Sequence, residues 1–317
     1  MITILITTYN DANSLPKTIK SVLSQSYKHY ELLIVDDGSN DDTQNVIGKF
    51  NDDNRIRYVK TEHRGRSAAL NYGLKIAKYD WIFLLDADDL ILPHTLKRYS
   101  EYITSSTNTV ISSFTCFYKN NRLLFYLDYP TNDDEIKIFL HLHSINNTVL
   151  YNRQFILNTI TGYNESLINS EEDYDLWLRA FDQITFIIIP EYLTIKGFRN
   201  DSFSKREASI KRKKIYLLQE KFYNRMNFSI INEDYELLGW REFFYGSKRK
   251  TREYFYKLGI QLLKKPKILT AILLTKLPEK LLHRILLHNY YPRIQYKLKY
   301  FSNKFIVIRK FIKAVNK

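Results

Sequence analysis

Short apolar segments alternate with helical segments of about ten residues along the first 90 positions of the chain. The pattern predicts strands at 2–6, 31–35, 56–59 and 81–85 and helices at 13–25, 42–50 and 67–77. Strands that alternate with helices in this way form a largely parallel sheet with right-handed crossovers. The segment 81–85 is apolar almost throughout, as in a central strand covered on both faces. The sequence therefore predicts a doubly wound α/β fold.

Polar side chains follow three of the expected strands. These segments are Thr7-Thr8-Tyr9-Asn10-Asp11, Asp36-Asp37-Gly38-Ser39 and Asp86-Ala87-Asp88-Asp89. Ligands of open α/β sheets bind beyond the carboxyl ends of the strands, so the three segments should converge on one edge. An aromatic ring, an acceptor for a base edge and an acid pair would together hold a nucleoside diphosphate. The alternative is that these acids lie in solvated turns.

The acid pair Asp86 and Asp88 suits a hard divalent cation that bridges phosphates, either Mn²⁺ or Mg²⁺. The first loop lacks the glycines of a phosphate cradle, so basic side chains must help to neutralise the phosphates. Arg64 and Arg66, just before the third expected helix, are the candidates. A solvated helix start is the alternative for both, and it applies less to Arg66.

A second group of acids, Glu171-Glu172-Asp173, follows the segment 162–167. We expect a helix from about Asp173, with Leu176, Trp177 and Ala180 on its buried face. Acids in the first turn of a helix are ordinary capping residues, and on local sequence alone this interpretation is the simpler one.

Charge divides the chain near position 204. Residues 1–204 contain 20 basic and 26 acidic side chains, whereas residues 205–317 contain 28 basic and 8 acidic ones, giving net charges of −6 and +20. Clustered acids suit metal-dependent chemistry, and a basic segment suits an anionic partner such as a lipid headgroup or a nucleic acid. We predict two domains, 1–204 and 205–317.

The chain begins with an apolar strand instead of a basic leader, and no apolar run reaches the roughly 18 residues of a membrane span. The single cysteine, Cys116, fits a reducing compartment. We expect a cytoplasmic protein, peripheral at the inner face of the cell membrane.

Several phrases in the correct order resemble the inverting family 2 glycosyltransferases of the GT-A fold, over roughly residues 2–204. The phrases are Ile4-Leu5-Ile6-Thr7-Thr8-Tyr9-Asn10, Val35-Asp36-Asp37-Gly38-Ser39, Gly65-Arg66-Ser67-Ala68-Ala69-Leu70-Asn71-Tyr72-Gly73, Leu85-Asp86-Ala87-Asp88-Asp89 and Glu172-Asp173-Tyr174-Asp175-Leu176-Trp177-Leu178-Arg179. The resemblance implies a GT-A type, Rossmann-like domain at 1–204 that binds a nucleotide sugar.

The resemblance also implies a role for each matching residue. Thr7 and Tyr9 would line the base pocket, Asp37 would read the base, Asp36 would support that loop, Asp86 would meet the ribose or a metal-bound water, and Asp88 would bind the metal. Asp173 would be the catalytic base, with Glu172 as the second candidate. A single base without a nucleophilic partner implies direct displacement and therefore inversion.

One segment of the sequence departs from the family pattern. Many relatives carry a histidine before a Ser-x-Ser segment, whereas this chain has Arg199 at about that position, before Ser202 and Ser204. An arginine cannot ligate a cation, but it can contact a phosphate directly. We expect Arg199 to bind the pyrophosphate of the donor.

Residues 205–317 carry no comparably specific motif. We expect amphipathic helices at 205–228 and 236–264, with leucines, isoleucines and tyrosines among lysines, a composition that suits a helix in a membrane interface. A solvated helical hairpin packed on the first domain is the alternative.

Two classes of function follow. The first is a metal-dependent hexosyl- or N-acetylhexosaminyl-transferase that moves a sugar from a nucleotide-sugar donor to a glycan or lipid-linked acceptor in cell-surface polysaccharide biosynthesis; we expect the donor to be UDP-linked. It would bind an anionic membrane through 205–317, and no nucleic acid is expected. The second is a non-catalytic basic protein that binds membrane or nucleic acid on a GT-A-like scaffold. A nucleotidyltransferase is disfavoured because the first loop lacks a glycine-rich phosphate grip.

Overall fold

The computed structural model describes residues 1–119, 122–129, 131, 148–167 and 171–197, together with the shorter segments 216–219, 238–240, 242–243, 247–259 and 266–277. The statements below concern these residues.

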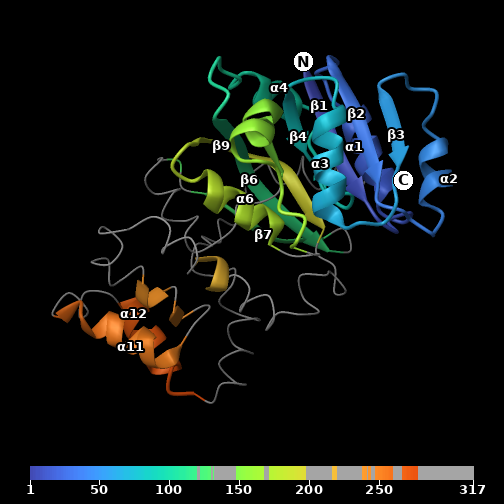
Figure 1. Ribbon diagram of the computed structural model, residues 1–317. Helices are drawn as coiled ribbons and strands as arrows, with labels where there is room; N and C mark the ends of the chain where they lie inside the picture. Colours follow the sequence, from blue (N-terminus) through green and yellow to red (C-terminus); the bar gives the residue numbers. More distant parts are fainter. Residues whose placement is uncertain are drawn as a thin grey trace.

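A single mixed sheet forms the centre of the part of the molecule built by residues 2–197 (Figure 1). Its first half consists of four parallel strands in the order β3-β2-β1-β4, with bounds β1 Ile2–Thr8, β2 Tyr30–Asp36, β3 Ile56–Lys60 and β4 Trp81–Leu84. The predicted parallel arrangement is confirmed for these strands. Each predicted strand agrees with the observed one to within two residues at its ends.

The second half of the sheet mixes both strand directions. It continues β8-β6-β9-β5, and β7 pairs with β6; the bounds are β5 Leu90–Ile91, β6 Thr109–Lys119, β7 Arg122–Leu127, β8 Val149–Asn152 and β9 Thr185–Gly197. The strand β8 is antiparallel to both β4 and β6, β9 is parallel to β6, and β5 is antiparallel to β9. This half lies outside the βα alternation from which the parallel sheet was predicted.

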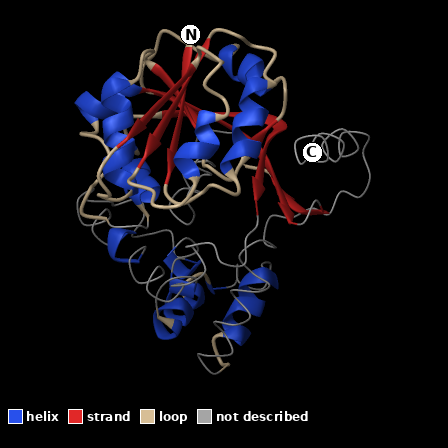
Figure 2. Ribbon diagram, turned by 90° about the vertical axis from the view of Figure 1, so that its right-hand side faces the viewer, coloured by secondary structure: helices blue, strands red, loops and turns tan. Residues whose placement is uncertain are grey.

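Helices cover both faces of the sheet (Figure 2). Alternate residues of each central strand point to opposite faces, so that Ile4 and Ile6 join one apolar cluster and Leu5 the other. The first cluster includes residues of α1 Leu15–Leu23, α2 Thr43–Gly48 and α4 Thr95–Ser100. The second includes residues of α3 Arg66–Ile76, the π-helix η1 Phe155–Thr159 and α6 Glu172–Ala180. The buried face predicted for α6 is confirmed, since Leu176, Trp177 and Ala180 are all buried.

Parallel register brings the strand ends to a common edge. Thr8 pairs with Asp36, and the carbonyl of Thr8 accepts a hydrogen bond from the amide of Asp37 at 2.9 Å. The strand β4 ends beside the same edge, since the amide of Leu85 donates to the carbonyl of Leu5 at 3.1 Å. The three polar segments that follow β1, β2 and β4 therefore leave the sheet together, as predicted.

Two helices of the basic segment are described, α11 Lys248–Tyr256 and α12 Pro266–Leu274. They lie side by side (Figure 1), and Arg252 Nη1 donates to Thr275 Oγ1 at 3.1 Å. Buried side chains of both helices, Phe255 and Ile268 among them, belong to the apolar cluster that contains α6 residue Trp177. The packing of these helices therefore resembles the hairpin alternative. The rest of the helices predicted at 205–228 and 236–264 lies largely outside the described residues.

Within the described part of the chain, every helix is too short or too polar to cross a bilayer.

Candidate functional site

Arg66 connects the acids after β4 with the acids of α6. Its Nη2 donates to Asp86 Oδ1 at 2.6 Å, and its Nη1 donates to Glu172 Oε1 at 2.8 Å and lies 3.5 Å from Asp173 Oδ2. Arg66 is the first residue of α3, directly after Gly65, whose φ of 93° is a backbone conformation that glycine adopts without strain. The two groups of acids, which the sequence places 86 positions apart, therefore form one site.

The guanidinium of Arg66 remains charged in this setting. Burial acts to lower its pKa, but the carboxylates of Asp86, Asp173 and Glu172 outweigh this effect and hold the pKa well above its usual value. The planar fork of donors lets a single side chain hold acids from two directions.

Lys196, near the end of β9, supplies a second cation. Its Nζ lies 3.2 Å from Asp86 Oδ2 and 3.4 Å from Asp89 Oδ2. Antiparallel pairing of β5 with β9 aligns Leu90 with Ile195 and so brings Lys196 next to Asp89. Sequence reasoning missed this lysine, because its position depends on a strand pair whose members are more than 100 residues apart.

Asp173 lies in the first turn of α6 and is 8% exposed. Its Oδ1 is buried and has no hydrogen-bond partner among the described residues. Burial raises the pKa of the carboxyl to about 7, since the opposing effect of Arg66 does not outweigh burial and the neighbouring carboxylates of Glu172 and Asp86 add to it. No local sequence pattern encodes this burial, so the raised pKa is a finding of the structure.

The acids after β2 organise the adjoining loops. Asp37 is buried, and its carboxylate accepts hydrogen bonds from the amides of Arg64 and Gly65 at 2.9 and 3.0 Å. Asp36 Oδ1 accepts from the amide of Ser39 at 2.7 Å, and its Oδ2 accepts from the Tyr58 hydroxyl at 2.6 Å. Asp37 therefore links the segment after β3 to the end of β2, while Asp36 stabilises the turn that follows β2.

Tyr9 and His63 form a stacked pair above this loop. Their ring centroids are 4.1 Å apart with an interplanar angle of 13°, and Tyr9 remains 42% exposed. His63 Nδ1 lies 2.9 Å from the Asp37 carbonyl oxygen and 2.8 Å from Asp37 Oδ2. Since a carbonyl only accepts, the proton of the neutral ring belongs on Nδ1. Sequence reasoning missed His63, which belongs to none of the recognised phrases.

The predicted site residues thus fall into two neighbouring groups. Arg66, Asp86, Glu172 and Asp173 are in direct contact, whereas Thr7, Tyr9, Asp36 and Asp37 surround the ends of β1 and β2. Asp88 is half-buried in the loop after β4, and Thr7 is half-buried at the end of β1. Arg64 pairs with Glu165 at 3.2 Å at an exposed position. Arg199 lies outside the described residues.

The acids suit a divalent cation only if a ligand completes its coordination. The described residues contain no group of three His, Cys, Asp or Glu side chains arranged to hold a metal ion. Both carboxylate oxygens of Asp86 face cationic side chains, Arg66 and Lys196. Mg²⁺ is commonly held by one or two carboxylates together with substrate phosphates, and Asp88 offers such a hard oxygen ligand.

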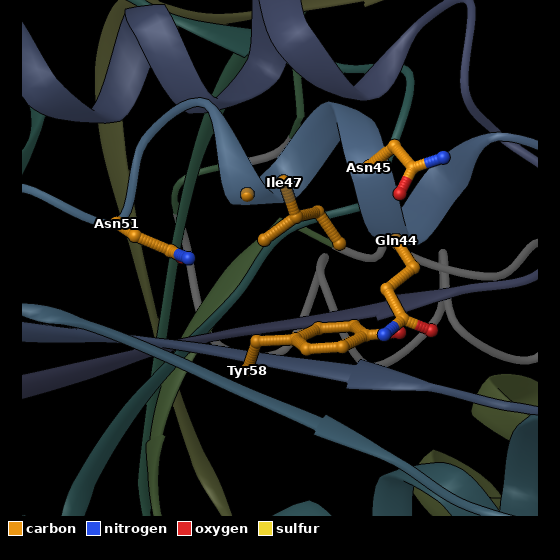
Figure 3. Close-up of a pocket in the computed structure, with 6 residues that line it drawn as sticks. Gln44, Asn45, Ile47, Asn51 and Tyr58 are labelled. Atoms are coloured by element: carbon orange, nitrogen blue, oxygen red, sulfur yellow. The ribbon is translucent and has the colours of Figure 1, made fainter.

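A pocket of about 310 Å³ lies between α2 and β3 (Figure 3). Gln44, Asn45, Ile47, Gly48, Asn51 and Tyr58 line it. None of these lining side chains is charged, and the pocket contains no candidate base or nucleophile. We therefore assign the chemistry to the acids around Arg66.

The sequence comparisons identify one family. The model of glycosyl transferase family 2 matches residues 3–170. An uncharacterized glycosyltransferase of Rickettsia typhi is 30% identical over 211 residues, which cover 64% of this chain and 65% of the relative. The UDP-Glc:alpha-D-GlcNAc-diphosphoundecaprenol beta-1,3-glucosyltransferase WfaP of Escherichia coli is 32% identical over 186 residues, which cover 58% of this chain and 71% of the relative.

The chain spans less than two thirds of the length of the similar Rickettsia proteins, from 65% for that of Rickettsia typhi down to 31% for that of Rickettsia bellii. A shorter match of 38% identity over 91 residues is to the poly-beta-1,6-N-acetyl-D-glucosamine synthase of Staphylococcus aureus, covering 28% of this chain and 22% of the relative.

Two solved structures share the fold. Residues 1–349 of S. aureus TarS in complex with UDP-GlcNAc superpose with a TM-score of 0.61 at 18% identity, covering 88% of this chain and 82% of that TarS chain. The mannosyltransferase PcManGT of Pyrobaculum calidifontis, in complex with GDP-Man and Mn²⁺, gives a TM-score of 0.58 at 14% identity and covers 99% and 85%.

Proposed function

Because the chain belongs to glycosyl transferase family 2, we propose that it transfers a sugar from a UDP-linked donor to a hydroxyl of a glycan or lipid-linked acceptor, with inversion at the anomeric carbon. The observation that carries this proposal is the position of Asp173, a buried carboxylate with one unpaired oxygen, joined through Arg66 to the acids after β4. The fold is of the GT-A type.

Asp173 is our choice for the base. A sugar hydroxyl is a poor nucleophile, so a carboxylate must accept its proton as the oxygen attacks the anomeric carbon. Glu172 Oε1 already accepts a close hydrogen bond from Arg66 at 2.8 Å, whereas Asp173 lies 3.5 Å from the same nitrogen and its Oδ1 has no partner among the described residues. Glu172 therefore serves to hold Arg66, and Asp173 accepts the proton.

The donor lies along the edge formed by the ends of β1, β2 and β4. Tyr9 and Thr7 contact the base, and Asp37, which fixes the loop through Gly65, reads its edge. Arg66 and Arg199 contact the diphosphate, and Asp86 meets the ribose. Asp88 would hold Mn²⁺ or Mg²⁺, which would supply Lewis-acid stabilisation of the charge on the leaving nucleoside diphosphate.

The relatives support the choice of donor and acceptor class. WfaP is by its name a glucosyltransferase that uses UDP-Glc and a lipid-diphosphate acceptor, and TarS binds UDP-GlcNAc. The relative from S. aureus is by its name a poly-beta-1,6-N-acetyl-D-glucosamine synthase, which supports a role in polysaccharide synthesis. We propose that this protein acts in cell-surface polysaccharide biosynthesis at the cytoplasmic face of the membrane, with residues 205–317 toward anionic lipid.

Slow hydrolysis of the donor in the absence of acceptor tests this function. The full chain would be incubated separately with UDP-Glc, UDP-GlcNAc and GDP-Man, with Mn²⁺ or with EDTA, and the released nucleotide measured. Release of UDP from one UDP-sugar, lost in Asp88→Asn, supports the proposal. Asp182→Asn is the matched control, because Asp182 is exposed beyond the end of α6. Release from none of the donors, or equal release by Asp88→Asn, contradicts it.

A further inference from the structure

The acids around Arg66 outnumber the cations that the described structure places beside them. Asp86, Asp88 and Asp89 lie in the loop after β4, and Glu172 and Asp173 are the first two residues of α6. Arg66 and Lys196 are the two basic side chains that form ion pairs with these acids in the described part of the chain. A nucleoside diphosphate carries further negative charge, so it can bind here only if enough of the carboxylate charge is neutralised.

Lys196 is placed to provide this neutralisation. Its Nζ bridges Asp86 Oδ2 at 3.2 Å and Asp89 Oδ2 at 3.4 Å, and its side chain is 20% exposed while that of Asp89 is 2% exposed. Arg66 faces the other oxygen of Asp86. The ammonium therefore reaches the interior of the acid cluster and keeps an accessible side.

The backbone of β9 is shaped for this close approach. The next residue, Gly197, has no side chain, and a Cβ atom at this position would lie 3.1 Å from the carbonyl oxygen of Asp88. A contact of this length is tighter than ordinary van der Waals packing, so a larger residue would push β9 away from the acidic loop. Glycine at 197 thus keeps Lys196 within reach of the acids.

We propose that the Lys196 ammonium is a resident cation of the donor site, which neutralises Asp86 and Asp89 and contributes to binding a nucleoside diphosphate without a divalent ion. The inference rests on the proposed function, because it concerns the positive charge that binds the diphosphate in the proposed donor site. It also explains why Asp86 has no free oxygen for a metal while Asp88 lies beside the same loop. A divalent cation then adds to the charge of Lys196 instead of supplying all of it.

The proposal is tested by binding UDP and uridine to the full chain by calorimetry, in EDTA and in saturating Mn²⁺. In EDTA, the wild type should bind UDP more tightly than uridine. Lys196→Met should weaken UDP binding in EDTA by at least about tenfold, the loss expected for a hydrogen bond to a charged group. Lys196→Arg should retain most of the affinity, and Lys20→Met, an exposed lysine of α1, is the matched control.

Titration with Mn²⁺ alone gives a readout independent of turnover. Lys196→Met frees Asp86 Oδ2 and Asp89 Oδ2, so Mn²⁺ should bind more tightly to this variant than to the wild type, and saturating Mn²⁺ should restore most of its UDP affinity. Unchanged UDP binding of Lys196→Met in EDTA overturns the proposal.

UDP and uridine binding by the wild type alone also tests the role of Lys196, so the proposal remains testable even if Lys196→Met does not fold. Wild-type protein that binds UDP no better than uridine in EDTA, but binds it tightly in Mn²⁺, overturns the role of Lys196 and leaves the proposed function intact. Failure to bind any nucleoside diphosphate under either condition overturns both.

Discussion

Asp173 combines burial, an unpaired oxygen and a nearby cation, three features that suit a base which must switch its charge during turnover. Burial raises the pKa of this carboxyl to about 7. A base is most effective when its pKa lies near the working pH, since it is then both ionised and able to take a proton. The neighbour Glu172, which holds Arg66 at 2.8 Å, is committed to an ion pair.

This pKa predicts the pH dependence of the reaction. Only the ionised form of Asp173 accepts a proton, so kcat/KM should increase by about tenfold per pH unit on the acid side and become level above about pH 7. A pH profile of donor turnover at low donor concentration measures it. A profile that is already level from pH 5 upward would remove Asp173 as the titrating base.

The same shift predicts how stability depends on pH. The folded protein keeps a proton on Asp173 between about pH 4 and pH 7, whereas the unfolded chain releases it, so the free energy of unfolding contributed by this group decreases as the pH rises through that window. Asp173→Asn lacks this loss. Urea denaturation should therefore show the variant gaining stability relative to the wild type from pH 5 to pH 8, with Asp182→Asn as control. A constant difference would contradict the raised pKa.

At the scale of elements, the site depends on the connection between α3, β4 and α6. Arg66 begins α3, Asp86 follows β4, and Glu172 begins α6. Their mutual contacts hold the start of α6 against the sheet edge at the end of β4. Removal of the arginine would leave partly buried carboxylates without their cation, which is costly.

We predict that Arg66→Met destabilises the protein by about 3 kcal/mol or more, the usual consequence of removing one partner of a buried ion pair. Arg249→Met is the control, because Arg249 pairs with Glu253 on the surface of α11, where the two side chains are 82% and 53% exposed. That change should cost less than about 1 kcal/mol. Urea denaturation followed by circular dichroism gives both values. Equal effects of the two changes would show that the Arg66 contacts carry no special weight.

Elements that are specified by neighbouring residues in the sequence could be predicted, whereas elements that depend on contacts between distant residues could not. The strands β1 to β4 and helices α1 to α3 are specified by apolar periodicity, and their polar ends identified the edge that carries the site. The strand pairing in the mixed half of the sheet escaped prediction, because the pairing of β6 with β8 and β9 is decided by tertiary packing.

The missed residues have the same explanation. Lys196 acquires its role only when β9 pairs with β5, and His63 acquires its role only when Asp37 and Tyr9 fold against the segment after β3. Neither carries a motif of its own. The raised pKa of Asp173 likewise depends on burial in the folded protein, which no local pattern encodes.

At the scale of the whole molecule, part of the basic segment packs on the α/β part of the chain. Gln219 Nε2 donates to the hydroxyl of Tyr174 in α6 at 2.8 Å, and α11 and α12 bury Phe255 and Ala271. On the outer side, Arg249, Lys250 and Lys257 are exposed, and Tyr256 is 56% exposed. Basic and aromatic side chains together suit the interface of an anionic membrane.

We predict that the full chain sediments with vesicles containing anionic lipid at low salt and is released at high salt, since each basic residue near the surface contributes about 1 kcal/mol and salt screens this attraction. Arg249→Glu combined with Lys257→Glu should weaken binding, and Lys20→Glu combined with Lys49→Glu is the control on the α/β part of the chain. Equal binding to neutral vesicles would contradict the electrostatic account, and preferential capture by duplex DNA would favour a nucleic-acid partner.

The central claim is that Asp173 takes the proton of the acceptor in a family 2 glycosyltransferase site. The most direct measurement compares Asp173→Asn with the wild type in two assays, turnover of the preferred UDP-sugar with acceptor and calorimetric binding of UDP. We predict that turnover falls by at least about a hundredfold, the usual contribution of a general base, while UDP binding changes by less than about threefold, because the group acts only as the acceptor is deprotonated. Turnover of Asp173→Asn close to that of the wild type would contradict the claim, and an inactive Glu172→Gln alongside it would move the base to Glu172.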